Sequence, residues 1–356
     1  MINIVEPTLA TDAGHCSSFI NSLINASMGS VPFRLWASRS ATVGFNKTYI
    51  ELNKYFYRRF RRLQSYFLYR RLLKSGQKIF ISTAGRTDLL LLNWAARGQI
   101  PFGQVFLYFH WFNPSPKKIS SLKKMALLQP NLNILGPTPS VVNVFKEAGF
   151  VNVRVVPYPI TPRISNELSG RQYFRYLLYA GAARQDKGFR YVVDLIEYLS
   201  VAKRDIPVVI QTSVEYLGKC DAETLADIER LKSISYPHLN MLTEVLSVEE
   251  YENLYSGAIV IQLYAKNDFT DRISGVTLDA LSAGCPVIST SGTWIARMVE
   301  RFEAGLIVAD VTPENVLRAV TQIINNYTQV NEHAIKAGLV LQDENSANAL
   351  YKVLTE

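Results

Sequence analysis

The sequence of 356 residues is poor in cysteine and histidine, with three of the former and four of the latter. Cys16, Cys220 and Cys285 lie far apart and form no C-x-x-C pair. This spacing argues against a disulfide framework and against a structural zinc site. A reducing compartment fits the composition best.

We expect neither an export signal nor a membrane-spanning segment in this sequence. Met1 leads directly into strand-like sequence, without a charged segment, an apolar segment and a cleavage site. The charge-free stretches 98–116 and 125–145 are interrupted by Pro, Gly, Asn and Gln, whereas a spanning helix needs continuous apolar sequence. We therefore expect a cytoplasmic protein without a membrane-spanning helix.

Acidic residues are scarce in the first half of the chain. Residues 1–160 contain 20 Lys and Arg against 5 Asp and Glu, a net charge of +15, and residues 161–356 contain 18 against 25, a net charge of −7. A cationic half joined to an anionic one suggests that the first half faces a negative partner. Phospholipid headgroups, a phosphorylated acceptor and nucleic acid are the alternatives.

The hydrophobic content of 48% and the charged content of 19% are typical of a globular protein. Strand-like and helical segments alternate in both halves, which predicts two Rossmann-like, doubly wound domains that face a cleft. The proline-rich segment 157–163 and the polar run 165–171 are the best linker candidates. We place the first domain at 1–160, the second at 161–335, and a C-terminal helix that can pack back on the first domain at 336–356.

The segment 178–189 joins a strand to a helix through small residues and two cations. Gly181 allows the backbone to approach a ligand closely, and Arg184 and Lys187 stand just before the helix. Backbone N–H groups at a helix start and nearby cations together favour a diphosphate. The alternative is an ordinary strand-to-helix turn with two solvated cations.

The segment 271–288 contains two carboxylates eight residues apart. Asp271 is expected in a loop, where it could touch a sugar hydroxyl, and Asp279 in a helix, where it could accept hydrogen bonds from a ribose diol. The helix start around Ser274 and Gly275 would direct backbone donors toward phosphate. The alternative is a loop carboxylate and a surface carboxylate without a ligand.

These two segments resemble the C-terminal domain of retaining nucleotide-sugar glycosyltransferases of family 4 (glycosyl transferases group 1), which have the GT-B fold. The similarity extends over about residues 133–325 and is weak in the first 130. It implies that Arg184 and Lys187 hold the donor diphosphate, that Asp271 approaches the donor sugar, and that Asp279 binds the ribose. The family normally has Glu at both carboxylate positions, and the two shorter Asp side chains here alter the reach of each carboxylate.

The first domain offers a further set of candidates at the carboxyl ends of its strands, where doubly wound sheets bind ligands. A loop of small residues contains Asp12, Gly14 and His15. His15 could contact the acceptor, or act as the general base of an inverting enzyme with Asp12 orienting it. His110 ends another strand, and the resemblance implies a donor-sugar contact there; the alternative is a histidine packed in an aromatic cluster.

Residues 55–74 combine seven cations with aromatic and aliphatic side chains and contain no acid. Such a helix could dock on anionic lipid. The alternatives are a helix packed on the sheet with a solvated basic face, and a nucleic-acid patch, which no fold motif supports. The cations proposed to contact a membrane or the acceptor are Arg58, Arg59, Arg61, Arg62, Arg70 and Arg71.

Together these features predict a hexosyltransferase-type glycosyltransferase that moves a sugar from a UDP- or GDP-sugar to a glycan or lipid-linked acceptor. We expect retention of configuration, no metal and no other cofactor, no nucleic-acid partner, and peripheral attachment to the inner face of the plasma membrane. A role in bacterial cell-surface polysaccharide or glycolipid assembly follows from the resemblance. The alternatives are a non-catalytic nucleotide-sugar or polyanion binder, a nucleotide-sugar hydrolase or epimerase, and an inverting transferase that uses His15.

Overall fold

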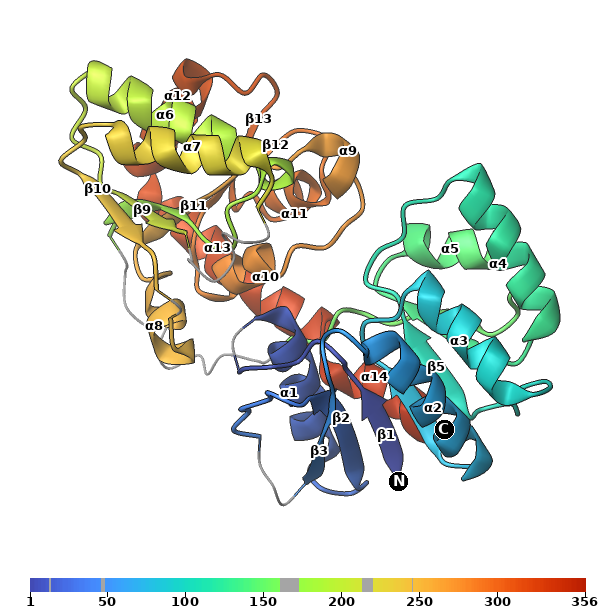
Figure 1. The fold of residues 1–356 in the computed structure, drawn as a ribbon. Coiled ribbons are helices and arrows are strands. Elements are labelled where there is room, and N and C mark those ends of the chain that lie inside the picture. Colours follow the sequence, from blue (N-terminus) through green and yellow to red (C-terminus); the bar gives the residue numbers. More distant parts are fainter. Residues whose placement is uncertain (13, 46–48, 161–172, 213–219, 245) are drawn as a thin grey trace. The chain divides into compact units, whose positions relative to one another are not determined.

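The computed structural model of the chain describes residues 1–12, 14–45, 49–160, 173–212, 220–244 and 246–356. The chain forms two compact units (Figure 1). Unit 1 comprises Met1–Thr161 and Glu344–Glu356, and unit 2 comprises Pro162–Asp343. The polar run 165–171, expected as a linker, lies outside the described residues.

Unit 1 contains a seven-stranded sheet in which every neighbouring pair of strands is parallel. The strand order is β3-β2-β1-β4-β5-β6-β7, so the order reverses between β1 and β4. Short strands such as Ile2–Val5, which is apolar except for Asn3, are buried along their whole length, as strands covered on both faces must be. The strands are β1 (Ile2–Val5), β2 (Phe33–Ser38), β3 (Ile50–Phe56), β4 (Lys78–Ile81), β5 (Val105–Tyr108), β6 (Asn133–Gly136) and β7 (Val153–Val155).

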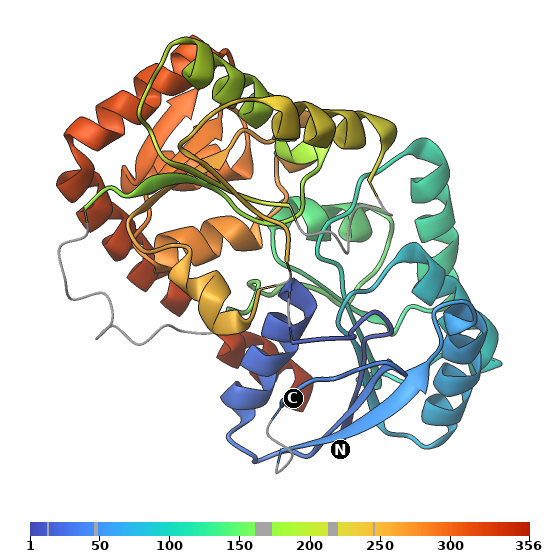
Figure 2. The ribbon, with the colours of Figure 1, turned by 60° about the vertical axis from the view of Figure 1, so that its left-hand side comes forward.

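Two groups of helices accompany this sheet. Buried side chains of α2 to α5 join the strands in one apolar core, and α1 packs against α14 (Figures 1 and 2). The side chains of Leu350 and Leu354 on α14 are fully buried. The helices are α1 (His15–Ser27), α2 (Arg61–Lys74), α3 (Arg86–Ala96), α4 (Pro116–Leu128), α5 (Pro139–Glu147) and α14 (Ala347–Thr355).

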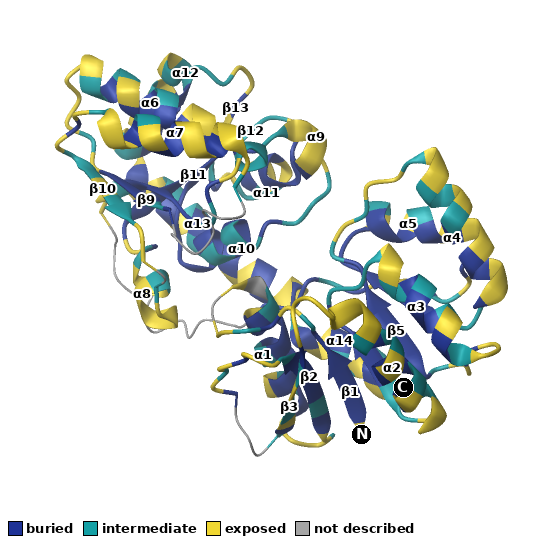
Figure 3. Cartoon of the chain, in the orientation of Figure 1, coloured by how far each residue is buried: buried dark blue, intermediate teal, exposed yellow. Residues whose placement is uncertain are grey.

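Unit 2 repeats this architecture with six parallel strands in the order β10-β9-β8-β11-β12-β13, which reverses between β8 and β11. Figure 3 shows buried strands and helices whose outer sides are exposed. The strands are β8 (Tyr176–Tyr179), β9 (Val208–Gln211), β10 (Leu239–Leu242), β11 (Ala258–Gln262), β12 (Val287–Thr290) and β13 (Gly305–Val308). The helices are α6 (Phe189–Val201), α7 (Ala222–Ser233), α8 (Val248–Asn253), α9 (Lys266–Phe269), α10 (Gly275–Ser282), α11 (Trp294–Phe302), α12 (Pro313–Asn325) and α13 (Tyr327–Glu344).

The predicted fold class, two Rossmann-like α/β domains, is confirmed, and two local predictions need correction. Residues 55 and 56 do not begin a basic helix, because they close strand β3, which pairs in parallel with β2; the helix α2 starts only at Arg61. Residues 336–356 do not form one helix. α13 extends to Glu344, and the separate α14 starts after Ser346, whose side chain caps it.

The chain leaves unit 1 and returns to it at neighbouring points. The backbone N–H of Ile160 donates to the carbonyl oxygen of Asn345 at 3.1 Å, so the segments on either side of unit 2 are hydrogen-bonded to each other within unit 1. Unit 2 is therefore inserted between the last strand of unit 1 and its last helix.

Helix α13 approaches the end of α10 at Gly338. A Cβ atom at this position would lie 2.3 Å from the carbonyl oxygen of Leu281 and 2.8 Å from the Cα of Ser282. The backbone of α10 would have to move to accept a methyl group there, so the absence of a side chain allows the two helices to pack this closely.

We predict that Gly338→Ala destabilises the protein although alanine favours a helix. The gain in helix propensity is about 1 kcal/mol, and overpacking against backbone atoms costs about 1–3 kcal/mol or more where the backbone cannot yield. The unfolding midpoint in urea should fall. Gly98→Ala is the control, because a Cβ there meets nothing within 4 Å. Equal midpoints for the two variants would contradict this account of the packing.

Candidate active site

The turn after β8 places Gly181, which has no side chain, at the carboxyl edge of the unit 2 sheet, where the strand order reverses. Gly181 has a φ of 91°, a conformation that favours glycine. Its N–H donates to Gln211 Oε1, at the end of the neighbouring β9, at 2.8 Å. In open α/β sheets, this position is the usual ligand-binding crevice.

Lys187 and α10 converge on Gly181. A Cβ atom at Gly181 would lie 3.1 Å from Lys187 Nζ and 3.5 Å from Val276 Cγ2, in the first turn of α10. The ammonium group also lies 5.7 Å from the centroid of the Tyr264 ring. The Lys187 ammonium group and the first turn of α10 therefore both lie next to the backbone of Gly181, and this arrangement is suited to binding phosphate.

The start of α10 is fixed by a buried hydrogen-bond network around Gln262, the last residue of β11. Gln262 Nε2 donates to Ser274 Oγ at 3.2 Å, and Thr277 Oγ1 donates to Gln262 Oε1 at 2.7 Å. Ser274 Oγ in turn accepts the N–H of Thr277 at 3.3 Å and caps the helix. A Cβ at Gly275 would meet nothing within 4 Å, so the space beside this first residue of the helix is open.

Arg184 lies in the same turn and forms an ion pair with Asp186. Arg272, from the loop before α10, reaches the same Oδ2 atom of Asp186 at 3.6 Å. Burial lowers the pKa of Arg272, and repulsion from Arg184 lowers that pKa further. Two arginines thus share the Asp186 carboxylate, and the Asp268 carboxylate also favours the charged form of Arg272.

The two predicted carboxylates lie where the sequence suggested, one in a loop and one in a helix, and both have partners. Asp271 Oδ1 accepts from Arg297 Nη2 of α11 at 2.6 Å, and both side chains are about half exposed. Asp279, in α10, accepts from Tyr251 Oη of α8 at 3.1 Å. Burial raises the pKa of Tyr251 well above its usual value, and the Asp279 carboxylate adds to this effect, so the tyrosine stays protonated and donates.

In unit 1 the predicted glycine-rich loop lies between β1 and α1. The exposed Asp12 carboxylate accepts the N–H of Gly44 at 3.0 Å from each oxygen. Gly14 has a φ of 91° and is the residue before α1, and a Cβ there would meet nothing within 4 Å. His15 is the first residue of α1, and its side chain lies outside the described part of the chain.

His110 follows β5 and lies in an aromatic cluster. The centroids of Phe19, Tyr108 and Tyr158 are 5.2, 5.1 and 5.5 Å from that of its ring. Its Nε2 is 2.8 Å from the carbonyl oxygen of Ser82, which follows β4. His110 is thus packed among aromatic side chains. It is also half-buried and lies at the edge of the sheet where a doubly wound domain binds ligands.

Sequence reasoning missed three polar residues beside these candidates. Glu6 follows β1 and is fully buried; Gln262 is fully buried in unit 2; and Arg272 reaches Asp186. The sequence gives little sign of them, because partners such as Ser82 for Glu6 and Asp186 for Arg272 lie 76 and 86 residues away along the chain. The strand ends at which Glu6 and Gln262 lie were the only available signal.

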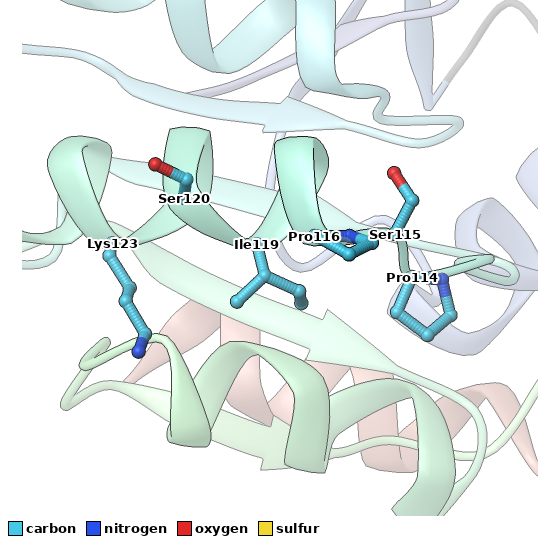
Figure 4. Close-up of a pocket in the computed structure, with 6 residues that line it drawn as sticks. All are labelled: Pro114, Ser115, Pro116, Ile119, Ser120 and Lys123. Carbon is cyan, nitrogen blue, oxygen red and sulfur yellow. The ribbon is translucent and has the colours of Figure 1, made fainter.

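A shallow hollow lies on α4 in unit 1 (Figure 4). Ile119 and Lys123 point to the same side of the helix there, and Ser120 points away. The hollow follows the loop after His110 and offers apolar surface with one cation. It is lined by Pro114, Ser115, Pro116, Ile119, Ser120 and Lys123.

Comparison with known proteins assigns the chain to a class. Residues 175–326 match the model of a family described as glycosyl transferases group 1. No curated protein matches the chain. The fold is similar along its whole length to that of WaaG, described as a glycosyltransferase involved in lipopolysaccharide biosynthesis, with a TM-score of 0.68, 12% identity and 100% of each chain covered.

Two further solved structures share the fold. One is described as trehalose-6-phosphate from E. coli bound with UDP-2-fluoro glucose, with a TM-score of 0.68, 11% identity, and 100% of this chain and 99% of that chain covered. The other is HepE from Anabaena in complex with UDP and glucose, with a TM-score of 0.63, 12% identity, and coverage of 99% and 97%. Residues 175–326 therefore match the group 1 glycosyl transferases, and the chain is a glycosyltransferase with the GT-B fold, as the sequence predicted.

We predict that Arg272 contributes to nucleotide diphosphate binding. A charge-assisted hydrogen bond is worth about 1.5–3 kcal/mol, so Arg272→Ala should weaken UDP or GDP binding about tenfold or more in isothermal titration. The matched control is Arg297→Ala, which removes an arginine that pairs with Asp271 and not with Asp186. Equal affinities for Arg272→Ala and the unmodified protein would exclude Arg272 from the diphosphate site.

Proposed function

We propose that the protein transfers a sugar from a nucleotide diphosphate sugar to an acceptor hydroxyl, with retention of configuration and without a metal. The observation that carries the proposal is the convergence of Lys187 and the start of α10 on the open backbone at Gly181. Solved structures of the same fold described with UDP and glucose, or with UDP-2-fluoro glucose, support a nucleotide sugar as the donor.

In this proposal unit 2 binds the donor. Lys187, Arg184 and the N–H groups of Gly275 and Val276 offset the charge that develops on the leaving diphosphate. Asp279 accepts hydrogen bonds from the ribose while Tyr251 holds its carboxylate in place. Asp271 approaches the donor sugar, and its ion pair with Arg297 limits how far this shorter side chain can turn.

The proposed reaction needs no covalent enzyme intermediate. The acceptor oxygen forms a bond to the anomeric carbon as the bond from that carbon to the diphosphate oxygen breaks, and the acceptor proton passes to the departing phosphate. His110 contacts the donor sugar, and the loop with Asp12, Gly14 and His15 contacts the acceptor. An inverting reaction with His15 as base is the alternative, and the anomeric configuration of the product distinguishes the two.

The test is release of nucleotide diphosphate from a panel of UDP- and GDP-sugars, with and without glycan and lipid-linked acceptors. We expect acceptor-dependent release, which Lys187→Ala lowers at least tenfold because one phosphate charge loses its partner. Lys232→Ala is the control, since Lys232 is exposed on α7 and pairs with Glu229. Release that ignores the acceptor would indicate a hydrolase, and no release from any donor would indicate a binding protein.

A basic and apolar surface on unit 1 suggests where the enzyme works. Residues 57–128 contain 14 Lys and Arg and a single acid, Asp88. Four large apolar side chains next to exposed arginines are themselves about half exposed or more, namely Tyr57, Phe60, Leu63 and Phe67. Among the residues that the structure describes, none of the helices is both long enough and apolar enough to cross a bilayer. We therefore propose peripheral binding to anionic lipid on the cytoplasmic face of a bacterial membrane, where a glycolipid or polysaccharide acceptor would be assembled.

We predict that replacing Arg58, Arg59, Arg61 and Arg62 by Gln abolishes most binding to vesicles that contain anionic lipid. Each cation near such a surface contributes about 1 kcal/mol, and salt screens this attraction. The matched control replaces four exposed cations of unit 2, Arg190, Lys203, Arg204 and Lys232, by Gln. Loss of activity on a short soluble acceptor, without any vesicle binding by the unmodified protein, would instead assign the four arginines to the acceptor site.

A further inference from the structure

Glu6 is a fully buried carboxylate at the ligand-binding edge of unit 1. It directly follows β1, and Ser82 directly follows β4, the neighbouring strand at which the strand order reverses. The side chain has no exposed surface. An acid at such a position must have several hydrogen-bond donors, because burying a charge without partners costs far more than a folded domain can offset.

Four hydrogen bonds supply these partners. Glu6 Oε2 accepts from Ser82 Oγ at 2.7 Å and from Thr83 Oγ1. Glu6 Oε1 accepts from the N–H of Thr8 at 3.2 Å and from the Thr8 hydroxyl. The carboxylate thereby joins the loop that leads toward Asp12 and Gly14 to the loop that follows β4.

Stability alone does not explain a carboxylate in this place. Replacing a buried ionic group and its partners by apolar side chains of similar volume is often neutral or stabilising. The fixed geometry that its hydrogen bonds impose on two loops is the property that an apolar side chain would not provide.

The second of these loops contacts His110 through the carbonyl oxygen of Ser82. The carbonyl oxygen of Ser82 can only accept a hydrogen bond, so the 2.8 Å contact requires a proton on His110 Nε2. In the neutral ring Nδ1 is then the acceptor. The same residue, Ser82, uses its hydroxyl to bind Glu6 and its carbonyl to bind His110.

We infer that Glu6 is a positioning residue, which holds Ser82 and Thr83 so that His110 keeps one tautomer and one ring orientation at the ligand-binding edge of unit 1. This inference rests on the proposed function for its effect on catalysis, but the tautomer can be measured independently. Partial burial, with the nearby Glu6 carboxylate adding to it, raises the pKa of the half-buried Cys16 thiol to about 12.

The test compares Glu6→Gln with Asp88→Asn. Both variants exchange a carboxylate of unit 1 for an amide, and Glu6 is fully buried whereas Asp88 is half-buried. The partners of Asp88 are Tyr69 and the N–H of Gly85, not Ser82. The readouts are the tautomer of His110 from the nitrogen chemical shifts of its ring, the kcat and donor KM of transfer, and the affinity for UDP or GDP.

We expect Glu6→Gln to give a mixed His110 tautomer and to lower kcat at least tenfold, with nucleotide affinity within twofold because unit 2 binds the nucleotide. Asp88→Asn should keep the Nε2–H tautomer. An unchanged tautomer or an unchanged kcat in Glu6→Gln would overturn the inference.

If Glu6→Gln does not fold, Ser82→Ala replaces it, because this variant removes the hydroxyl that binds Glu6 and keeps the carbonyl. The same expected and contradicting results then apply to Ser82→Ala. If the unmodified protein transfers no sugar from any donor, the proposed function fails, while the tautomers of the three variants still decide whether Glu6 positions His110.

Discussion

The close approach of charged groups to the backbone at Gly181 is the constraint on which the donor site depends. A Cβ atom at residue 181 would lie 3.1 Å from Lys187 Nζ, from the turn before α6, and 3.5 Å from Val276 Cγ2 at the start of α10, and the φ of 91° there also favours glycine. The start of α10 is in turn held by Gln262, and its end by the packing of α13 at Gly338. Elements spread over more than 150 residues of the sequence thus position a cation and the N–H groups of a helix start beside Gly181.

Both units have a buried polar side chain at a strand end where the strand order reverses. A buried polar side chain directly after or at the end of a strand, Glu6 in unit 1 and Gln262 in unit 2, accepts or donates hydrogen bonds that fix the following loop. Parallel strands buried on both faces leave polar groups little room except at their ends. A ligand site at that edge therefore needs polar supports that are themselves buried, and Glu6 and Gln262 have this position in the two units.

Much of the fold could be predicted from the sequence, because the alternation of apolar runs and helical segments is local. The local sequence also predicted two segments of the candidate site, the turn around Arg184 and Lys187 and the helix start at Ser274, because their small residues and cations are close together in the chain. Strand β3 was missed because aromatic residues at its end run into a basic helix. Arg272 and Glu6 could not be recognised, because their roles depend on Asp186 and Ser82, which only the folded sheet brings near them.

The insertion of unit 2 into unit 1 has a consequence for the order in which the protein is made. Helix α14 buries Leu350 and Leu354 where it packs beside α1, yet these leucines are translated more than 300 residues after α1. Domains commonly fold as they leave the ribosome, the N-terminal one first. Unit 1 cannot follow this order to completion, because the part of α1 that packs against α14 stays uncovered while all of unit 2 is synthesised. A premature stop before Ala347 would leave that part of α1 permanently uncovered.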